Sequence, residues 1–231
     1  MTSLSAEQVL ARNTEAMGAE LGPVFTALTN ELVWLHMRWA NYLALFGASP
    51  SRVELVNRAA GTFFHIIQVV MWNDLLLGVA RVTDPPRTGG RDNLTVQRLP
   101  ALVTGTPIDG AIRTQLDAVL TGADFARDWR NRHLAHRDLA RAIAGKEAEP
   151  LASASVAAVR ECLSLIAALL NIIDNHYLES TMFYDMDYAP GDAQSLLGVL
   201  RHGLDAKDAY LERLRAGLAT HEEMERFRSA V

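Results

Sequence analysis

The residues best suited to chemistry gather in one short stretch of the chain, between positions 127 and 141. An arginine guanidinium is a permanently charged fork that matches a phosphate group, and a histidine near neutral pKa can move a proton to or from a ribose hydroxyl. Together they could cleave RNA without a metal, using the neighbouring 2′-hydroxyl as nucleophile. The stretch contains Arg127, Asp128, Arg130, Arg132, His133, His136, Arg137, Asp138 and Arg141.

The charge of the whole chain makes this arginine-rich stretch stand out. The net charge is −5, and general affinity for nucleic acid comes from Lys and Arg side chains that neutralise phosphates. An acidic chain that handles RNA must therefore do so at a local basic site. The alternative is a solvated helix face whose cations suit a helix C-terminus, and composition alone does not exclude it.

Helical geometry adds a condition to the site. At about 100° per residue, Arg130, Arg137 and Arg141 fall within an arc of roughly 40°. His133 lies about 60° from Arg130, and His136 about 120° from it. Arg130 and His136 therefore face the same ligand only if the helix kinks or a second subunit completes the site.

The elements that position these residues are predicted to be helical, because apolar residues recur at steps of three and four and turn residues separate the runs. We expect an all-α four-helix bundle with additional N- and C-terminal helices, and no strand. Residues 1–180 would form the bundle, and 181–231 a helical extension that packs on it or on a partner. The helices are expected at 5–17, 21–46, 52–82, 93–103, 109–139 with a possible break at Gly122, 153–180, 193–216 and 220–228.

Composition favours a cytoplasmic protein. The chain is long enough to bury a core without disulfides, and its single cysteine, Cys162, cannot form an intramolecular one. Its first residues lack the pattern of a signal peptide. The apolar stretch 63–80 is interrupted by polar residues, and 163–173 is too short to span a bilayer. We expect both to be buried core helices, with no membrane contact.

The sequence gives little support for a metal site or for a nucleotide-hydrolysing site. Ferritin-like di-iron sites need Glu-x-x-His pairs, and no histidine here has a Glu three residues before it. A mononuclear histidine-rich bundle would use His36 or His65 with His133 and His136, but His36 and His65 are expected to be core histidines. Phosphate-binding glycine loops are absent from the sequence. We therefore expect no metal and no cofactor.

The motif Arg130-Asn131-x-x-x-Ala135-His136 resembles that of the HEPN superfamily, in which an Arg precedes a His by a few residues and a polar residue often follows the Arg. Over residues 21–177 the chain is similar to the AbiU-like branch, which is linked to bacterial abortive infection. The segments that carry this likeness are Trp39-x-x-Tyr42-x-x-x-Phe46, Ala80-Arg81-Val82-Thr83-Asp84 and Leu94-Thr95.

The resemblance implies a HEPN-type bundle and a metal-independent endoribonuclease that works as a homodimer, with the two motifs facing each other across a cleft. It makes His136 the acid/base residue, Arg130 the phosphate contact and Asn131 the residue that orients the site. Further substrate contacts are expected from His133, Arg137, Arg127 and Arg132.

Structural support for the motif helix is expected from Arg81, Asp84 and Asp138. Arg81 and Asp84 lie at a predicted helix end and could form a salt bridge that braces the motif helix, although a plain surface ion pair is an equal alternative. The alternative function is a catalytically inactive HEPN module that binds a nucleotide or a protein partner. The expected ligand is RNA or a nucleotide, and an antitoxin or another protein is a further possible partner.

Overall fold

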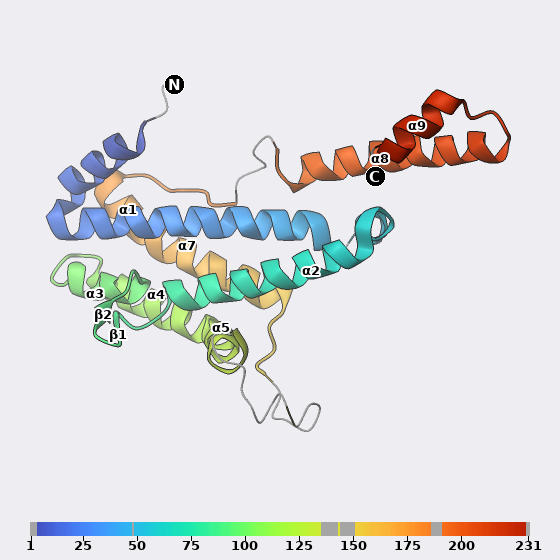
Figure 1. Ribbon diagram of the computed structural model, residues 1–231. Coiled ribbons are helices and arrows are strands. Elements are labelled where there is room, and N and C mark those ends of the chain that lie inside the picture. The colour runs from blue at the N-terminus through green and yellow to red at the C-terminus, as the bar shows by residue number, and fades with distance from the viewer. Residues whose placement is uncertain (1–3, 48, 135–142, 144–150, 186–190, 230–231) are drawn as a thin grey trace. The chain divides into compact units, whose positions relative to one another are not determined.

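The computed structural model describes residues 4–47, 49–134, 143, 151–185 and 191–229. Within these ranges the secondary structure is helical apart from one very short hairpin, and loops connect the helices (Figure 1), so the predicted all-α class is confirmed. The elements are α1 (Ala6–Phe46), α2 (Pro50–Val82), β1 (Arg87–Thr88), β2 (Arg91–Asp92), the 3₁₀ helix η1 (Val96–Arg98), α3 (Leu99–Leu102), α4 (Asp109–Gly122), α5 (Asp124–Trp129), the π-helix η2 (Arg130–Leu134), α7 (Val156–Leu178), α8 (Ala193–Arg215) and α9 (His221–Ser229).

The chain divides into two compact units, of which the first comprises Met1–Trp39 and Met71–Met186. Its core is built from the apolar faces of α1, α2, α4 and α7. Arg38 joins α1 to α2 through an ion pair with Asp74 (2.7 Å), and Gln115 of α4 donates to the backbone oxygen of Leu165 in α7 (3.0 Å). The fully buried large side chains of this unit are Leu28, Leu32, Leu35, Leu75, Leu76, Leu99, Ile112, Leu163, Ile166, Leu169, Leu170 and Ile173.

Local sequence signals account for the helix ends in this unit. The break expected between residues 17 and 21 occurs at Gly18, whose φ of 87° interrupts α1. Ser155 caps the N-terminus of α7, since its hydroxyl accepts a hydrogen bond from the amide of Ala158 (3.1 Å). At the other end, Glu179 adopts a left-handed conformation that stops the helix.

The loop after α2 contains the hairpin that sequence analysis did not predict. Arg87 pairs with Asp92 and Thr88 with Arg91, and the two residues between the strands are Gly89 and Gly90. Both glycines have positive φ (58° and 82°), which two-residue hairpin turns require. The expectation of no strand was therefore wrong at this point, because strands of two residues are too short to leave an alternating pattern.

The second unit comprises Ala40–Val70 and Asp187–Val231. Arg58 of α2 forms an ion pair with Asp208 of α8 (2.5 Å), and the amide of Ala193 donates to Asn41 (2.8 Å). A capping box starts α9 where a helix is predicted, since Thr220 and Glu223 exchange backbone-to-side-chain hydrogen bonds of 2.8 and 3.3 Å. The domain boundary expected at residue 180 stays a prediction.

The stretch 63–80 is not a buried helix throughout, contrary to expectation. Leu75, Leu76, Val79 and Ala80 are buried, but the side chains of Phe63, Ile66 and Val70 are more than half exposed. Several large apolar side chains in this part of α2 therefore lie at the surface of the described structure. By length and composition α2 and α7 could each cross a membrane, although core helices of soluble proteins meet the same criterion. The cytoplasmic location stays a prediction.

Candidate functional site

Arg130 begins a turn of helix that is not α-helical. Helix α4 ends at Gly122, Ala123 forms the junction with φ −97° and ψ −1°, and α5 runs only to Trp129. Residues Arg130–Leu134 then form a π-helix. The predicted break at Gly122 is thus confirmed, and within the described residues the motif segment departs from the regular α-helix on which the expected angles were based. Widened turns of this kind are frequent at functional sites, and they change which side chains share a face.

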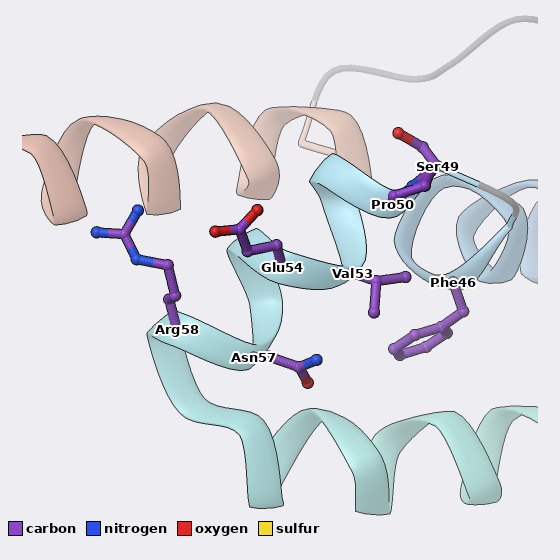
Figure 2. A pocket seen from close by; sticks show the side chains of 7 residues that line it. All are labelled: Phe46, Ser49, Pro50, Val53, Glu54, Asn57 and Arg58. Atoms are coloured by element: carbon purple, nitrogen blue, oxygen red, sulfur yellow. The ribbon is translucent and has the colours of Figure 1, made fainter.

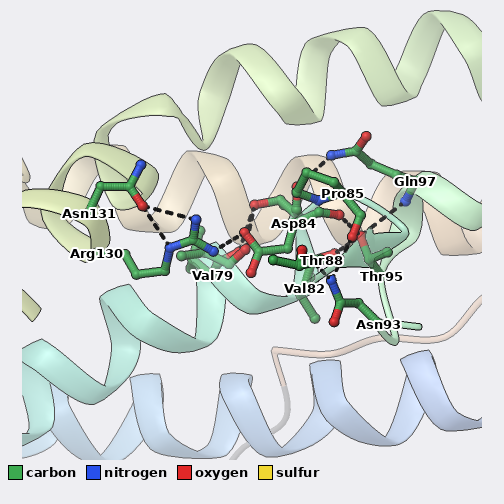
Figure 3. A network of polar contacts seen from close by, with 12 residues as sticks. Val79, Val82, Asp84, Pro85, Thr88, Asn93, Thr95, Gln97, Arg130 and Asn131 are labelled. Carbon is green, nitrogen blue, oxygen red and sulfur yellow. Dashed lines mark hydrogen bonds and ion pairs between the residues drawn. The ribbon is translucent and has the colours of Figure 1, made fainter. Parts of the chain in front are cut away.

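The guanidinium of Arg130 is held from two sides (Figure 3). Its Nη1 forms an ion pair with the Oδ1 of Asp84, at the end of α2. Its Nε and Nη2 both donate to the Oδ1 of Asn131, at 3.0 and 2.9 Å. The Arg130 side chain is 26% exposed and that of Asp84 is 14% exposed, so the pair is only partly hydrated. A forked cation is therefore placed at the protein surface with its plane fixed.

Asp84 is itself positioned by the segment that follows the hairpin. The hydroxyl of Thr95 lies 2.6 Å from the backbone oxygen of Asp84 and 3.0 Å from that of Val82. The side-chain amide of Gln97 donates to the backbone oxygen of Thr83 (2.8 Å). These contacts satisfy carbonyls at the end of α2 that the helix leaves without partners. The segment after the hairpin thereby positions Asp84, and Asp84 in turn holds Arg130, as Figure 3 shows.

The salt bridge expected between Arg81 and Asp84 does not form. Arg81 instead lies 3.5 Å from Glu31 of α1, whereas Asp84 pairs with Arg130. Asp84 therefore braces the motif helix directly. The sequence indicated that a charged residue at this helix end would support the motif, but it did not indicate which partner each charge would take, because both partners lie far away along the chain.

Arg127 serves the α4–α5 junction and not the surface beside Arg130. Its Nη2 donates to the backbone oxygen of Leu120 (2.6 Å) and forms an ion pair with Asp124. The side chain of Arg127 thus turns back to stabilise the end of α4, and its predicted substrate contact stays a prediction. Arg132 lies 3.3 Å from Asp128, a residue on the preceding turn of the helix.

His133 remains available at the surface. It is exposed, and its ring meets the edge of Trp129 at a centroid distance of 5.5 Å. Trp129 in turn donates from Nε1 to the backbone oxygen of Ala152 (2.8 Å), just before α7. The predicted residues His136, Arg137 and Asp138 lie outside the described ranges, and their roles stay predictions.

The two histidines considered for a metal site differ from each other. His36 is buried, with Nδ1 3.1 Å from Oδ1 of Asp185. Burial lowers the pKa of His36, although the neighbouring Asp185 carboxylate acts in the opposite direction. His65 is exposed, so the expectation that it is a core histidine was wrong. Among the residues described, no three His, Cys, Asp or Glu side chains are grouped as metal ligands.

Cys162 lies in the core of the first unit. It is fully buried in α7, and burial raises the pKa of its thiol to about 12. A thiol with so high a pKa supplies almost no thiolate at neutral pH, and the thiolate is the nucleophilic form. Cys162 is therefore unsuited to nucleophilic catalysis.

Two surface hollows accompany these features. One, of about 290 Å³, adjoins the Arg130 site and is lined by Glu31, Arg81, Val82, Asp84, Asn93 and Leu94. The other, of about 730 Å³, lies at the turn between α1 and α2 in the second unit (Figure 2) and is lined by Phe46, Ser49, Pro50, Val53, Glu54, Asn57 and Arg58. The first hollow is lined by Asp84, which pairs with Arg130 of the motif, whereas no residue lining the second hollow contacts Arg130 in the described part of the chain, so the first is the better candidate.

The sequence did not indicate several residues that line the first hollow or that help to position Arg130. Thr95 and Gln97 act through backbone carbonyls at the end of α2, and Glu31 comes from a different helix. A Thr before a short helix is a recognisable capping signal, so Thr95 could have been found. Glu31 carried no such signal.

Comparison with known proteins identifies the family to which the chain belongs. The family model described as AbiU2, a HEPN family, matches residues 18–194. No curated protein and no solved structure matches the chain. The matched range contains α2, the Asp84 support and the Arg130 motif, and it covers well over half of the sequence. The chain therefore belongs to the AbiU2 family of HEPN domains.

Proposed function

We propose that this HEPN domain is a metal-independent endoribonuclease of the toxin or phage-defence type that cleaves RNA in a cleft between two subunits. The observation that carries the proposal is the fixed guanidinium of Arg130, held by Asp84 and Asn131 in a π-helical turn. A planar fork held in this way is pre-organised to contact two phosphate oxygens. The cytoplasm is the expected location.

The reaction needs one phosphate contact and one proton carrier. The 2′-oxygen of the ribose attacks the adjacent phosphorus, the P–O5′ bond breaks, and the 2′-hydroxyl proton leaves to a base. The 5′-oxygen gains a proton, so the products carry a 2′,3′-cyclic phosphate and a 5′-hydroxyl. Arg130 would stabilise the charge on the phosphate oxygens, and His136 would carry the proton.

The contacts of Arg130 suggest how substrate would enter. Asn131 offers one neutral oxygen to two N–H groups, in the position that a phosphate oxygen would take. Asp84 holds a different nitrogen, Nη1. A phosphate can therefore replace the Asn131 contact while Asp84 keeps the guanidinium in place. A charged acceptor makes stronger hydrogen bonds than an amide oxygen, which favours the exchange.

The test is RNA cleavage by the purified chain in the presence of EDTA, with the new ends analysed for 2′,3′-cyclic phosphate. Arg130→Ala and His136→Ala should each abolish cleavage. The exposed residues Arg113 and His202 provide matched controls, and their alanine variants should cleave like the wild type. Unimpaired cleavage by His136→Ala would refute the proposed chemistry. A wild type that binds nucleotide but never cleaves RNA would establish the catalytically inactive module instead.

The growth of bacteria that express the protein provides a second test of the same proposal. Expression of the wild type should arrest a bacterial host, and Arg130→Ala or His136→Ala should relieve the arrest.

The proposed homodimer predicts that specific activity falls on dilution below the dissociation constant of the dimer, together with a change in mass measured by light scattering. Activity that stays with a monomeric species would refute the shared cleft.

A further inference from the structure

The hollow beside Arg130 has the composition of a binding site for a small polar group. We call it the Glu31 cavity, lined by Glu31, Arg81, Val82, Asp84, Asn93 and Leu94. Its volume, about 290 Å³, is at the lower end of the range for small-molecule sites. Asp84 lines the cavity and also pairs with Arg130, so a phosphate at Arg130 and a group in this cavity would be neighbours.

The walls of the cavity are rigid on the side of the hairpin loop. The Nδ2 of Asn93 donates both to the backbone oxygen of Pro85 (2.8 Å) and to the hydroxyl of Thr88 (2.9 Å). Arg98 donates to the backbone oxygens of Asn93 (2.6 Å) and Pro86 (3.0 Å). Because these bonds tie the loop to itself, the cavity is formed before a ligand arrives.

Glu31 and Arg81 contribute an acceptor and a donor to the lining of the cavity. Arg81 is half-exposed, and its Nη2 lies 3.5 Å from the Oε1 of Glu31, whereas the same oxygen lies 3.6 Å from Arg38. Such long, partly exposed ion pairs contribute little to stability, so a ligand can displace them at small cost.

This donor–acceptor pair is complementary to one nucleobase in particular. A carboxylate that accepts two parallel hydrogen bonds needs two adjacent N–H groups, and among the four RNA bases only the Watson–Crick edge of guanine has them, at N1 and N2. The O6 of guanine is an acceptor for an arginine such as Arg81. Leu94, which is partly exposed, offers an apolar surface to the base.

We infer that the Glu31 cavity binds the guanine of the nucleotide next to the scissile phosphate, so that this protein cleaves RNA beside guanine. The inference rests on the proposed function for its place in the reaction, but guanine binding is measurable without cleavage. A good bidentate contact discriminates between bases by about 5- to 150-fold, which sets the size of the expected preference.

The first experiment measures the binding of the four nucleoside 3′-monophosphates to the full chain by isothermal titration calorimetry. The guanosine nucleotide should bind at least about fivefold more tightly than the other three. Glu31→Gln should remove this preference, since an amide offers only one acceptor oxygen. Glu161→Gln, at an exposed position of α7, is the matched control and should keep it. Equal binding of all four nucleotides by the wild type, or no binding, would overturn the inference.

A second variant guards against a simple loss of folding. Glu31→Asp keeps both carboxylate oxygens and should keep a preference for guanosine at reduced affinity, whereas equal loss in Glu31→Asp and Glu31→Gln would count against recognition by the carboxylate. Thermal melting of each variant checks that the fold survives.

Mapping of cleavage sites in an RNA pool separates the two proposals. Cleavage beside guanine by the wild type, together with cleavage at all bases by Glu31→Gln, would support both the ribonuclease and the guanine site. Cleavage without base preference would overturn the guanine site and leave the ribonuclease intact. Selective binding of the guanosine nucleotide without any cleavage would refute the ribonuclease and support the cavity.

Discussion

Replacing Asp84 with alanine should both destabilise the fold and release Arg130, because the Asp84–Arg130 ion pair joins the end of α2 to the motif helix. The two side chains are 14% and 26% exposed, so water screens the pair only in part. A hydrogen bond to a charged group contributes roughly 1.5–3 kcal/mol, against about 0.2–1 kcal/mol for an exposed ion pair. In a chain of this length that loss lowers the Tm by roughly 3–12 °C.

A double-mutant cycle isolates this contribution. The free energy of unfolding is measured by denaturant titration for the wild type, Asp84→Ala, Arg130→Ala and the double variant, and the coupling energy should be about 1.5–3 kcal/mol. The control cycle uses Asp109 and Arg113, an i,i+4 pair on α4 at 2.7 Å. Its coupling should be only about 0.3–0.5 kcal/mol, as for other helix-surface pairs.

The comparison of the two cycles decides whether Asp84 positions Arg130. A coupling energy for Asp84 and Arg130 no larger than that of the control pair would refute the reasoning. In that case Arg130 would be an ordinary surface cation, and its fixed orientation would have to be abandoned as the basis of the site.

Three further predictions concern single side chains. Asn131→Asp places a carboxylate against Arg130 and should weaken RNA binding by about 5- to 30-fold in a filter-binding assay, because a charged acceptor competes with phosphate; unchanged affinity would contradict this. The pKa of His36 is lowered in the fold, so the unfolded chain binds more protons just below pH 6.5, and stability should fall as pH drops through that value. Denaturation at pH 7.5 and 5.5 should show this fall, and His36→Gln should reduce it. Cys162, with a thiol pKa of about 12, should react with a thiol reagent at pH 8 only after unfolding; rapid reaction of the folded protein would show that the site is open.

The helix ends were largely predictable because their signals are local. Ser155 caps α7 two residues after the predicted start at residue 153, and the Thr220–Glu223 box starts α9 at the predicted position. The break at Gly18 and the junction at Ala123 also follow from glycines in the sequence. Each of these features depends on residues within a few positions of one another.

Side-chain partners were predictable only in part. Arg130 and Asp84 were both identified, but their pairing joins residues 46 positions apart. Arg127 was expected at the ligand and is used at the end of α4. His65 was expected in the core and is exposed. Apolar periodicity does not reveal which part of a helix surface finds a packing partner, and several large apolar side chains of α2 are exposed.

The sequence is therefore sufficient for the all-α class, for the location of the Arg130 motif and for the family, because periodicity, caps and motif spacing are properties of contiguous residues. Only the tertiary structure decides that Asp84 holds Arg130 and that Glu31 and Arg81 line a cavity beside it. Those contacts depend on how helices cross and on which side chains meet, and these are set by many distant apolar contacts acting together.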